Sequence, residues 1–368
     1  MKILLTAARY FTGLLFIFSG LIKANDPLGL SYKMQEFFEL WHLEAFQDYT
    51  LTFSVIIIVF EIVAGVAVIV GWKMNLFSWL LLLLIIFFTF LTGYAVFSGK
   101  VRECGCFGDC IPLQANQSFI KDLVLLALIA FIFAFRHSIK SSVTSQSALL
   151  IILFTTIGAF SFQWFVLRHL PMLDCLPYKK GNNIPTKMLP PPGAIPDSSV
   201  ISFVYEKGGK ELEFTADNFP ADFNDTAYKY VRRYDKLIRK GNAEAAIKDF
   251  SLQTLSGNDT TQALLSTQGN QLFLFLKDGY KEGEWSDYFN MIRQAATKKG
   301  TAVFLVTNIS PDLVIPVFPG LIILRCDATA IKTAARANPT LIEVTNGTIQ
   351  QKWAFADFDK ALKSIATP

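Results

Sequence analysis

The sequence predicts an α-helical membrane bundle followed by a soluble α/β domain, and two observations support this fold class. Of its 368 residues, 52% are hydrophobic and only 17% are charged, a balance outside the range of soluble globular domains. The apolar residues are also concentrated in runs that approach the roughly 20 residues needed to cross a membrane. Five such runs occur, at residues 3–22, 51–70, 76–97, 119–135 and 148–167. None follows Pro171, so we expect the remainder to be soluble.

The first run is interpreted as an uncleaved helix, because it is longer than a signal-peptide core and no small-x-small cleavage site follows it. The short loops then predict the orientation. Lys2, Lys73, Arg136 and Lys140 fall on one side without acidic residues, whereas the other loops mix both signs. The positive-inside rule places the N-terminus in the cytoplasm, and five crossings place the C-terminus outside. The segment 26–49 fits either an amphipathic surface helix or an ordinary loop.

Two charged residues stand inside the apolar runs, Arg9 in the first and Glu61 near the centre of the second. Either charge alone in hydrocarbon would cost about 3 kcal/mol or more. An arginine side chain is long enough to reach the carboxylate if the two helices are antiparallel neighbours. We therefore expect an Arg9–Glu61 pair inside the bundle. The pair would act as a clamp between helices or, alternatively, as a site that handles protons or a quinone.

Three cysteines lie within seven residues after the third run, at Cys104, Cys106 and Cys110. This spacing suits disulfide exchange, a fixed structural bridge or a soft metal. A disulfide between Cys104 and Cys106 would close a tight ring and be a good oxidant, so these two are the candidate catalytic residues. Cys110 and Cys175 are candidate resolving thiols, because both are predicted on the outer side. Cys326 is expected to be a small buried residue. No paired C-x-x-C knuckles are present, so no metal is predicted.

The first two runs carry a pattern that resembles the DoxX family of small four-helix membrane proteins. The residues that carry it are Arg9, Gly13, Phe18-Ser19-Gly20, Lys23, Glu61, Gly65 and Gly71. The element Cys104-x-Cys106-Phe107-Gly108 is similar to the related MauE branch, which is associated with methylamine utilisation and disulfide formation. The resemblance covers about residues 1–137 and implies a four-helix bundle, to which residues 148–167 add a fifth transmembrane helix.

The MauE branch is in turn similar in architecture to vitamin K epoxide reductase, a quinone-coupled thiol oxidase. The resemblance therefore implies a quinone as the cofactor. Vitamin K epoxide reductase uses a C-x-x-C beside its quinone, and this chain has no C-x-x-C. For a protein of this type we expect the bacterial inner membrane, with the N-terminus in the cytoplasm and the C-terminal domain in the periplasm.

The soluble part begins with a proline-rich spacer and then alternates between strand and helix patterns. Pro185 and residues 190–193 predict a stiff, extended linker. Residues 201–214 alternate around a glycine pair and predict a hairpin, whereas residues 228–239 are interpreted as a basic helix. The later predicted elements are a hairpin at 250–261, strands at 271–276, 302–307, 321–325 and 341–344, a returning strand to Trp353, and helices at 285–298, 329–336 and the C-terminus.

This order of elements resembles a thioredoxin-like domain over residues 246–368. Asp249-Phe250-x-Leu252 looks like the entry hairpin of the peroxiredoxin and cytochrome-maturation branch, and Asn338-Pro339 matches the place where the fold keeps a cis proline. The resemblance implies a docking site near Asn338 and Pro339. Where the family carries C-x-x-C, residues 278–283 contain no cysteine, so we expect a binding module and not a disulfide exchanger.

The predicted domains are a four-helix membrane domain (1–140), a fifth transmembrane helix (141–170), a linker with a hairpin and helix (171–245) and the thioredoxin-like domain (246–368). Two functions remain open. One is a membrane thiol–disulfide component, which would be an oxidoreductase serving extracytoplasmic proteins or thiol substrates. The other is a non-enzymatic membrane scaffold whose cysteines are structural. The lipid bilayer is a partner in both, and the net charge of +4 is too small and scattered to predict nucleic-acid binding.

Overall fold

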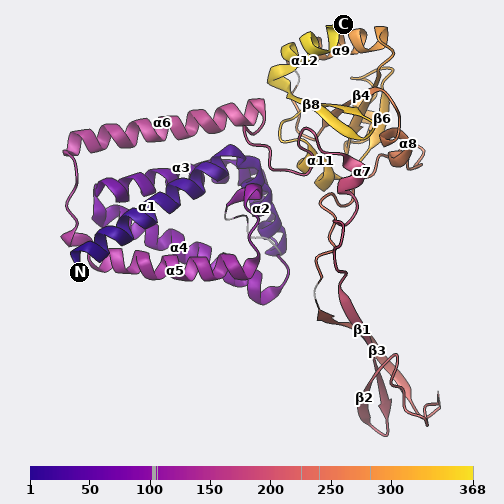
Figure 1. Ribbon diagram of the computed structural model, residues 1–368, viewed down its shortest axis with the longest axis horizontal. Coiled ribbons are helices and arrows are strands. Elements are labelled where there is room, and N and C mark those ends of the chain that lie inside the picture. The colour runs from indigo at the N-terminus through magenta and orange to yellow at the C-terminus, as the bar shows by residue number, and fades with distance from the viewer. Residues whose placement is uncertain (102–104, 106, 225, 240, 282, 368) are drawn as a thin grey trace.

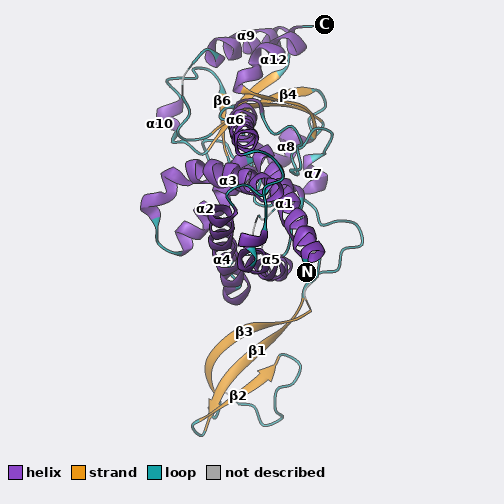
Figure 2. Ribbon diagram, turned by 90° about the vertical axis from the view of Figure 1, so that its left-hand side faces the viewer, coloured by secondary structure: helices purple, strands orange, loops and turns teal. Residues whose placement is uncertain are grey.

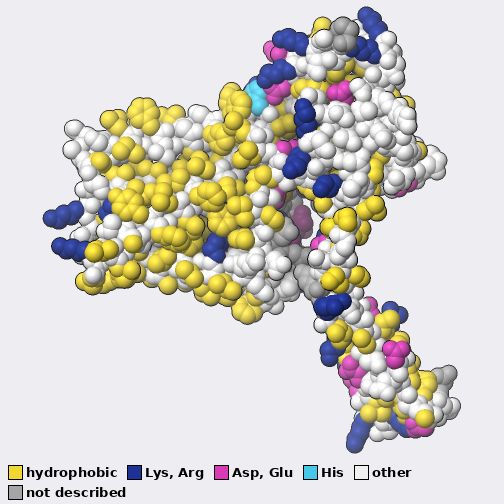
Figure 3. Space-filling model, viewed as in Figure 1, with side chains coloured by type: hydrophobic (Ala, Val, Ile, Leu, Met, Phe, Trp, Pro, Cys, Tyr) yellow, Lys and Arg dark blue, Asp and Glu magenta, His cyan; other side chains and the backbone are white. Residues whose placement is uncertain are grey.

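The computed structural model describes residues 1–368 except 102–104, 106, 225, 240, 282 and 368 (Figure 1). Five helices in the described part are long and apolar enough to span a membrane, which confirms the five predicted spans. They are α1 (Lys2–Asn25), α3 (Thr50–Val70), α4 (Met74–Ser98), α5 (Ala115–Ala134) and α6 (Ser145–His169). The helices form a bundle with the N-terminus at one end and the soluble parts beyond the other, which we call the docking end (Figure 1). Hydrophobic side chains cover much of the bundle surface, and the charged side chains gather mainly outside it (Figure 3).

The antiparallel helices α1 and α3 approach closely because glycines stand between them. A Cβ atom on Gly13 would lie 2.8 Å from the carbonyl oxygen of Gly65, and one on Gly20 would lie 2.5 Å from Cγ1 of Ile62. Small residues at such positions let two helix backbones pack in a membrane, where no hydrophobic effect drives helices together. The contacts fix the register, with residue 20 of α1 level with residues 61 and 62 of α3.

Helix α2 (Pro27–Leu40) follows α1 at the docking end, and a 3-10 turn η1 (Glu44–Tyr49) leads into α3. Asp26 is the N-cap of α2, and its Oδ1 accepts a hydrogen bond of 3.1 Å from the Gly29 amide, while Pro27 occupies the first turn. Of the two interpretations of residues 26–49, the amphipathic helix is therefore the right one for its first part. The position of α2 gives it two different neighbours, the bundle and the soluble domain.

The C-terminal domain is built on a five-stranded sheet with the order β6-β5-β4-β7-β8. The first three strands are parallel and the last two antiparallel: β4 (Asn270–Leu276), β5 (Ala302–Thr307), β6 (Ile322–Arg325), β7 (Thr340–Thr345) and β8 (Thr348–Ala354). The bond between Asn338 and Pro339, just before β7, is cis as predicted. Parallel β-α-β units joined to such a hairpin make this domain thioredoxin-like, which confirms the expected fold class.

Alternate residues of β4 supply two cores. Leu272, Leu274 and Leu276 pack with α9 (Trp285–Lys298) and α12 (Phe358–Ala366) on one face of the sheet. On the other face, Phe273 and Phe275 pack with α11 (Ala328–Ala334). Tyr178 and Ile184 also belong to the second core, the latter at the start of the short α7 (Ile184–Lys187). Part of the expected linker is therefore integrated into the domain. Two short helices, α8 (Thr261–Leu265) and α10 (Pro311–Val314), lie in its loops.

A separate three-stranded sheet projects away from both the bundle and the thioredoxin-like domain (Figures 1 and 2). Its strands are β1 (Ser198–Lys207), β2 (Lys210–Thr215) and β3 (Lys229–Arg239), in the order β2-β1-β3. The predicted hairpin is confirmed, since Lys207 pairs with Lys210 across the turn. The predicted helix at 228–239 is wrong. This segment is rich in tyrosine and β-branched residues, which suit a strand, and it pairs antiparallel with the free edge of β1.

Candidate functional site

An apolar cavity of about 230 Å³ lies inside the bundle near the docking end. Helices α1, α3, α4 and α5 form its walls, and one face of α2 covers it. Aromatic rings dominate the lining, at Phe16, Phe37, Phe38, Trp41, Phe53, Phe87, Phe88 and Phe107. Such a site suits a flat hydrophobic molecule, because aromatic faces contact a ring system without leaving polar groups unpaired.

The loop between α4 and α5 meets this cavity. Gly105 and Phe107 both line it, and Gly105 has a positive φ of 65°. A Cβ atom at Gly105 would lie 3.1 Å from Cγ of Lys33 on α2, so the loop passes closely over that helix. The candidate catalytic residues Cys104 and Cys106 lie outside the described residues. The residue between them in the sequence nevertheless belongs to the cavity wall.

The two candidate resolving thiols are bonded to each other. A disulfide joins Cys110, at the end of the loop, to Cys175, which follows α6. The bond ties the cysteine loop to the segment that enters the soluble domain. Cys326 is free and buried in the second core of that domain, and burial raises the pKa of its thiol to about 12. It therefore stays protonated at neutral pH, as expected for a packing residue.

The intramembrane charge pair differs from the expected one. Glu61 pairs with Lys23 and not with Arg9, and both members are buried, at 1% and 3% exposure. Ser19 lies 3.4 Å from the second carboxylate oxygen, so both oxygens of Glu61 have a partner. Lys23 and Glu61 line the cavity. The carboxylate is thus held by α1 at the edge of the apolar space.

The register of α1 and α3 explains the correction. Glu61 is level with residue 20, and Arg9 lies eleven residues below that point, about 16 Å along the helix. Arg9 instead donates to the Ile69 carbonyl at 3.2 Å and to Ser142 Oγ at 3.3 Å, near the opposite end of the bundle. The sequence signal for Lys23 was its place one residue beyond the first apolar run, within one helical turn of the level of Glu61.

A second charged group on the cavity wall comes from α5. Asp122 is fully buried and accepts hydrogen bonds from Lys121 Nζ and, at 3.0 Å, from Thr92 Oγ1 on α4. The Lys121 ammonium also lies 5.4 Å from the centre of the Phe107 ring. Lys121 and Asp122 are not among the predicted site residues, although a lysine and an aspartate inside the run 119–135 are a visible signal.

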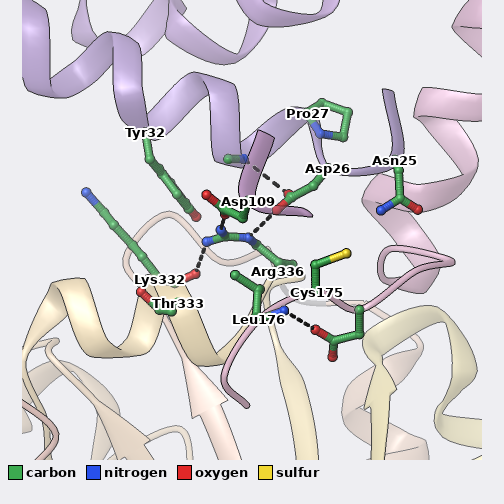
Figure 4. A network of polar contacts seen from close by, with 12 residues as sticks. Asn25, Asp26, Pro27, Tyr32, Asp109, Cys175, Leu176, Lys332, Thr333 and Arg336 are labelled. Atoms are coloured by element: carbon green, nitrogen blue, oxygen red, sulfur yellow. Dashed lines mark hydrogen bonds and ion pairs between the residues drawn. The ribbon is translucent and has the colours of Figure 1, made fainter. Parts of the chain in front are cut away.

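The other face of α2 holds the soluble domain through one arginine (Figure 4). Arg336, which follows α11 and is 5% exposed, donates through Nε to Asp26 Oδ2 at 2.7 Å and through Nη2 to Asp109. Asp26 thus caps α2 and binds the soluble domain at the same time. A Cβ atom on Gly29 would lie 3.0 Å from the Asp26 carboxylate and 3.3 Å from that of Asp109, so glycine leaves room for both. We call Arg336, Asp26 and Asp109 the clasp.

Further contacts surround the clasp. Asn25 exchanges two hydrogen bonds with the backbone of Leu173, at 2.9 and 3.0 Å. Lys277, the residue after β4, donates to Tyr32 Oη on α2 at 3.0 Å. The predicted docking residue Asn338 bonds to the backbone of Lys277 through its amide group. The part of the domain near the cis proline therefore faces the membrane bundle of the same chain.

The fold and the cavity together define a multi-pass membrane protein with a thioredoxin-like domain docked on one end of its bundle. Residues 1–135 match the family model described as Methylamine utilisation protein MauE, which confirms the expected resemblance of this part. Residues 199–240, which contain the three-stranded sheet, match a model described as Domain of unknown function (DUF8463). A search of curated proteins found no match.

Two solved structures from Xanthomonas campestris are similar to part of the chain. One is the bacterioferritin comigratory protein studied for alkyl peroxide reduction, and the other is peroxiredoxin Q. Each is 14% identical and covers 33% of this chain, with a TM-score of 0.26. The matches span 92% and 94% of those two chains.

Proposed function

We propose that the protein is a thiol–disulfide redox component of the bacterial cytoplasmic membrane that acts through Cys104 and Cys106. The observation that carries the proposal is that Gly105, which separates the two cysteines in the sequence, lines an apolar cavity inside the bundle. A likeness to the MauE family over residues 1–135 supports a redox-related membrane role. In this proposal, electrons pass from thiols outside the membrane to a carrier within it.

The lining of the cavity fits a quinone as that carrier. A quinone held there would take up the two electrons and two protons released when two thiols form a disulfide, and would leave as a quinol. Aromatic side chains contact the ring faces, and Lys23 and Lys121 are cationic donors on the α1 and α5 walls. Glu61 and Asp122 keep these ammonium groups in place through their ion pairs. The chain itself therefore supplies orientation and charge to an otherwise apolar site.

The orientation that this function requires places the docking end in the periplasm and the N-terminus in the cytoplasm. Lysine and arginine side chains mark the opposite end of the bundle in Figure 3, consistent with the positive-inside rule. The cysteine loop would then face an oxidising compartment, in which the Cys110–Cys175 disulfide persists. Thiol substrates or periplasmic protein partners would reach the cysteines there.

The thioredoxin-like domain has a positioning role in this proposal. Its single cysteine, Cys326, is buried, and the segment 278–283 near the cis proline contains none. The domain contacts the cysteine loop through Arg336 and Asp109 and contacts the cavity cover α2 through Tyr32 and Asp26. It therefore orders the parts of the membrane domain around the thiols and does not exchange disulfides itself.

The proposal is tested with the full-length protein in lipid nanodiscs, supplied with a dithiol and a short-chain quinone. We expect thiol-dependent loss of the quinone absorbance. Cys104→Ser and Cys106→Ser should each abolish it, whereas Cys326→Ala should retain it because that thiol is buried in a distant core. If the wild type shows no thiol-dependent quinone reduction, and maleimide labelling finds the same thiols before and after mild reduction, the protein is a scaffold with structural cysteines.

A further inference from the structure

A second cavity, of about 440 Å³, lies between the soluble domain and the docking end of the bundle. It is separate from the apolar cavity inside the bundle, because α2 lies between them. Tyr32 and Gln35 of α2 line the second cavity, and the opposite face of α2 covers the first. The soluble domain contributes Lys277, Lys332 and Arg336. Three cationic side chains therefore meet on one wall of a space that the redox function does not use.

Within the described part of the chain, two of these cations have no acidic partner. Lys277 Nζ donates to Tyr32 Oη at 3.0 Å and to the Ala335 carbonyl at 2.8 Å, which leaves one of its three donors. Lys332 Nζ donates to Gln35 Oε1 at 3.1 Å. Among the described residues, neither ammonium has a carboxylate within salt-bridge distance. Arg336, in contrast, is neutralised by the other two members of the clasp.

The charges around Lys277 favour an added anion. Burial and the nearby charges of Arg336 and Lys332 lower the pKa of Lys277 to about 7, and the charge of Asp26 offsets only part of this effect. Asp278 also lines the cavity, but it is exposed and accepts a hydrogen bond from the Gly279 amide. The charges of Arg336 and Lys332 both disfavour the protonated form of Lys277, and an anionic group beside the two lysines would oppose that effect.

Much of the remaining wall of the cavity is apolar, and its apolar part lies at the membrane boundary. Leu51 is the second residue of α3, and Leu167 stands two residues before the end of α6, so both mark the ends of membrane-spanning helices. Leu28 and Phe355 extend this surface. A ligand that fits the whole cavity therefore needs an anionic group on the side of the soluble domain and an apolar part on the side of the bilayer.

We propose that this cavity binds an anionic phospholipid of the adjacent leaflet, with the headgroup phosphate on Lys277 and Lys332 and the acyl end against Leu51 and Leu167. Tyr32 positions the Lys277 ammonium through its hydroxyl. Charge-assisted hydrogen bonds to a phosphate are shorter and stronger than neutral ones, and the apolar wall limits the access of water to them. The lipid would join the soluble domain to the membrane beside the clasp.

The test measures lipid binding to the full-length protein by native mass spectrometry from detergent, with phosphatidylglycerol, phosphatidylcholine or inorganic phosphate added. We expect phosphatidylglycerol to be retained at least tenfold more tightly than phosphatidylcholine. Lys277→Met with Lys332→Met should reduce that retention about tenfold or more, because methionine keeps the side-chain volume but removes the charge. The matched control Lys363→Met, at a lysine with 80% side-chain exposure on α12, should change nothing.

Further measurements distinguish a lipid from free phosphate as the ligand and test whether the charge of Lys277 is needed. Lys277→Arg should retain binding at pH 9, where the wild type weakens as Lys277 loses its proton. Arg336, Lys332, Asp26 and Tyr32 also face this group, and the substitution leaves all four in place. If inorganic phosphate binds as tightly as phosphatidylglycerol, the assignment of the ligand as a lipid is overturned. Equal retention of both lipids, or unchanged retention in the double variant, would overturn the site.

Discussion

The bundle and the docking interface each bury charged side chains, but the two groups are built differently. In the bundle, Lys23 and Glu61 belong to adjacent helices of one domain and are almost fully buried. At the interface, the clasp joins Arg336 of the soluble domain to Asp26 and Asp109 of the membrane domain, and the two carboxylates keep 12% and 30% side-chain exposure. The first group is enclosed within the bundle, whereas the second borders water.

This difference decides what each group controls. A charge left without its partner in hydrocarbon has no access to water, so the whole helix pair must adjust or unfold. A charge left alone at an interface is hydrated as soon as the two domains separate. We therefore expect the Lys23–Glu61 pair to support the fold of the bundle and the clasp to support only the docking of the soluble domain.

The largest effect is expected from Glu61→Ala, which leaves Lys23 buried without its carboxylate. By analogy with other broken buried pairs, the free energy of unfolding should fall by about 3–5 kcal/mol. The measurement is the unfolding midpoint of the full-length protein in detergent, followed by tryptophan fluorescence. The double variant Lys23→Met/Glu61→Leu is the control, since it removes both charges and should recover most of the loss. An unchanged midpoint in Glu61→Ala would show that the pair is hydrated.

The Cys110–Cys175 disulfide should have the next largest effect, because it closes a loop with a sequence separation of 65 residues. Cys110→Ser should lower the free energy of unfolding by about 2–4 kcal/mol. A reductant should shift the wild-type midpoint toward that of the variant and leave the variant itself unchanged. Cys326→Ala is the control with the disulfide intact. If the reductant shifts the midpoints of the wild type and of Cys110→Ser equally, the shift comes from another disulfide.

Arg336→Gln should separate the domains without unfolding the bundle. Removing the guanidinium leaves Asp26 and Asp109 close together, and docking should weaken by about 2–3 kcal/mol. Hydrogen exchange should rise in α2 and α11, with protection of α1 and α3 retained. The control Arg232→Gln removes an exposed ion pair to Glu211 and should change docking by less than about 0.5 kcal/mol. Loss of protection throughout the bundle would remove the distinction between the two groups.

The same variant has a pH dependence whose sign follows from Asp26. Burial raises the pKa of this carboxyl group even with Arg336 present. A raised pKa in the docked state means that docking favours the protonated form, so docking of Arg336→Gln should tighten as the pH falls through that pKa. Hydrogen exchange of α2 at pH 5 and pH 8 measures this. Weaker docking at the lower pH would contradict the assignment of Asp26 as the group left uncompensated.

Local patterns predicted most of the fold but not the contacts that make the site. The apolar runs gave the five spans, and the segments 285–298 and 302–307 match α9 and β5 because their periodicity is set by the residues they bury. The partner of Glu61 required the helix register, which depends on Gly13 and Gly65 packing across two helices. A choice between Arg9 and Lys23 as the partner of Glu61 therefore depends on how the two helices pack.

The clasp was beyond local analysis for the same reason. Arg336 was assigned to the end of a predicted helix, and its partners Asp26 and Asp109 lie 310 and 227 residues away. The sequence interpretation of residues 228–239 is a helix with a basic, solvated face, whereas pairing with β1 makes the segment a strand. Its tyrosine and β-branched residues suit a strand, but strand propensity depends on context, so the long-range pairing decides the structure.

The smallest effect is expected from removing the three-stranded sheet, which shares no buried charge with the bundle or the thioredoxin-like domain in the described part. Its core is its own, formed by Val204, Tyr228 and the aromatic residues around them. The chain enters and leaves it side by side, because Ile195 and Asn242 exchange hydrogen bonds of 2.7 and 2.8 Å. Insertions that begin and end at adjacent points are removed with little strain.

Replacing residues 198–240 by a short glycine–serine linker should therefore change the free energy of unfolding by less than about 1 kcal/mol. Thiol-dependent quinone reduction should also persist in the shortened protein, because neither the cavity nor the clasp contains a residue of the sheet. A matched control removes only the β1–β2 turn. A loss of more than about 2 kcal/mol would mean that the sheet supports the docked domains. Loss of activity with stability retained would instead place the binding site of the thiol substrate on the sheet. The sheet has no described contact with the cavity or the clasp, so it would then contribute to activity by binding a partner.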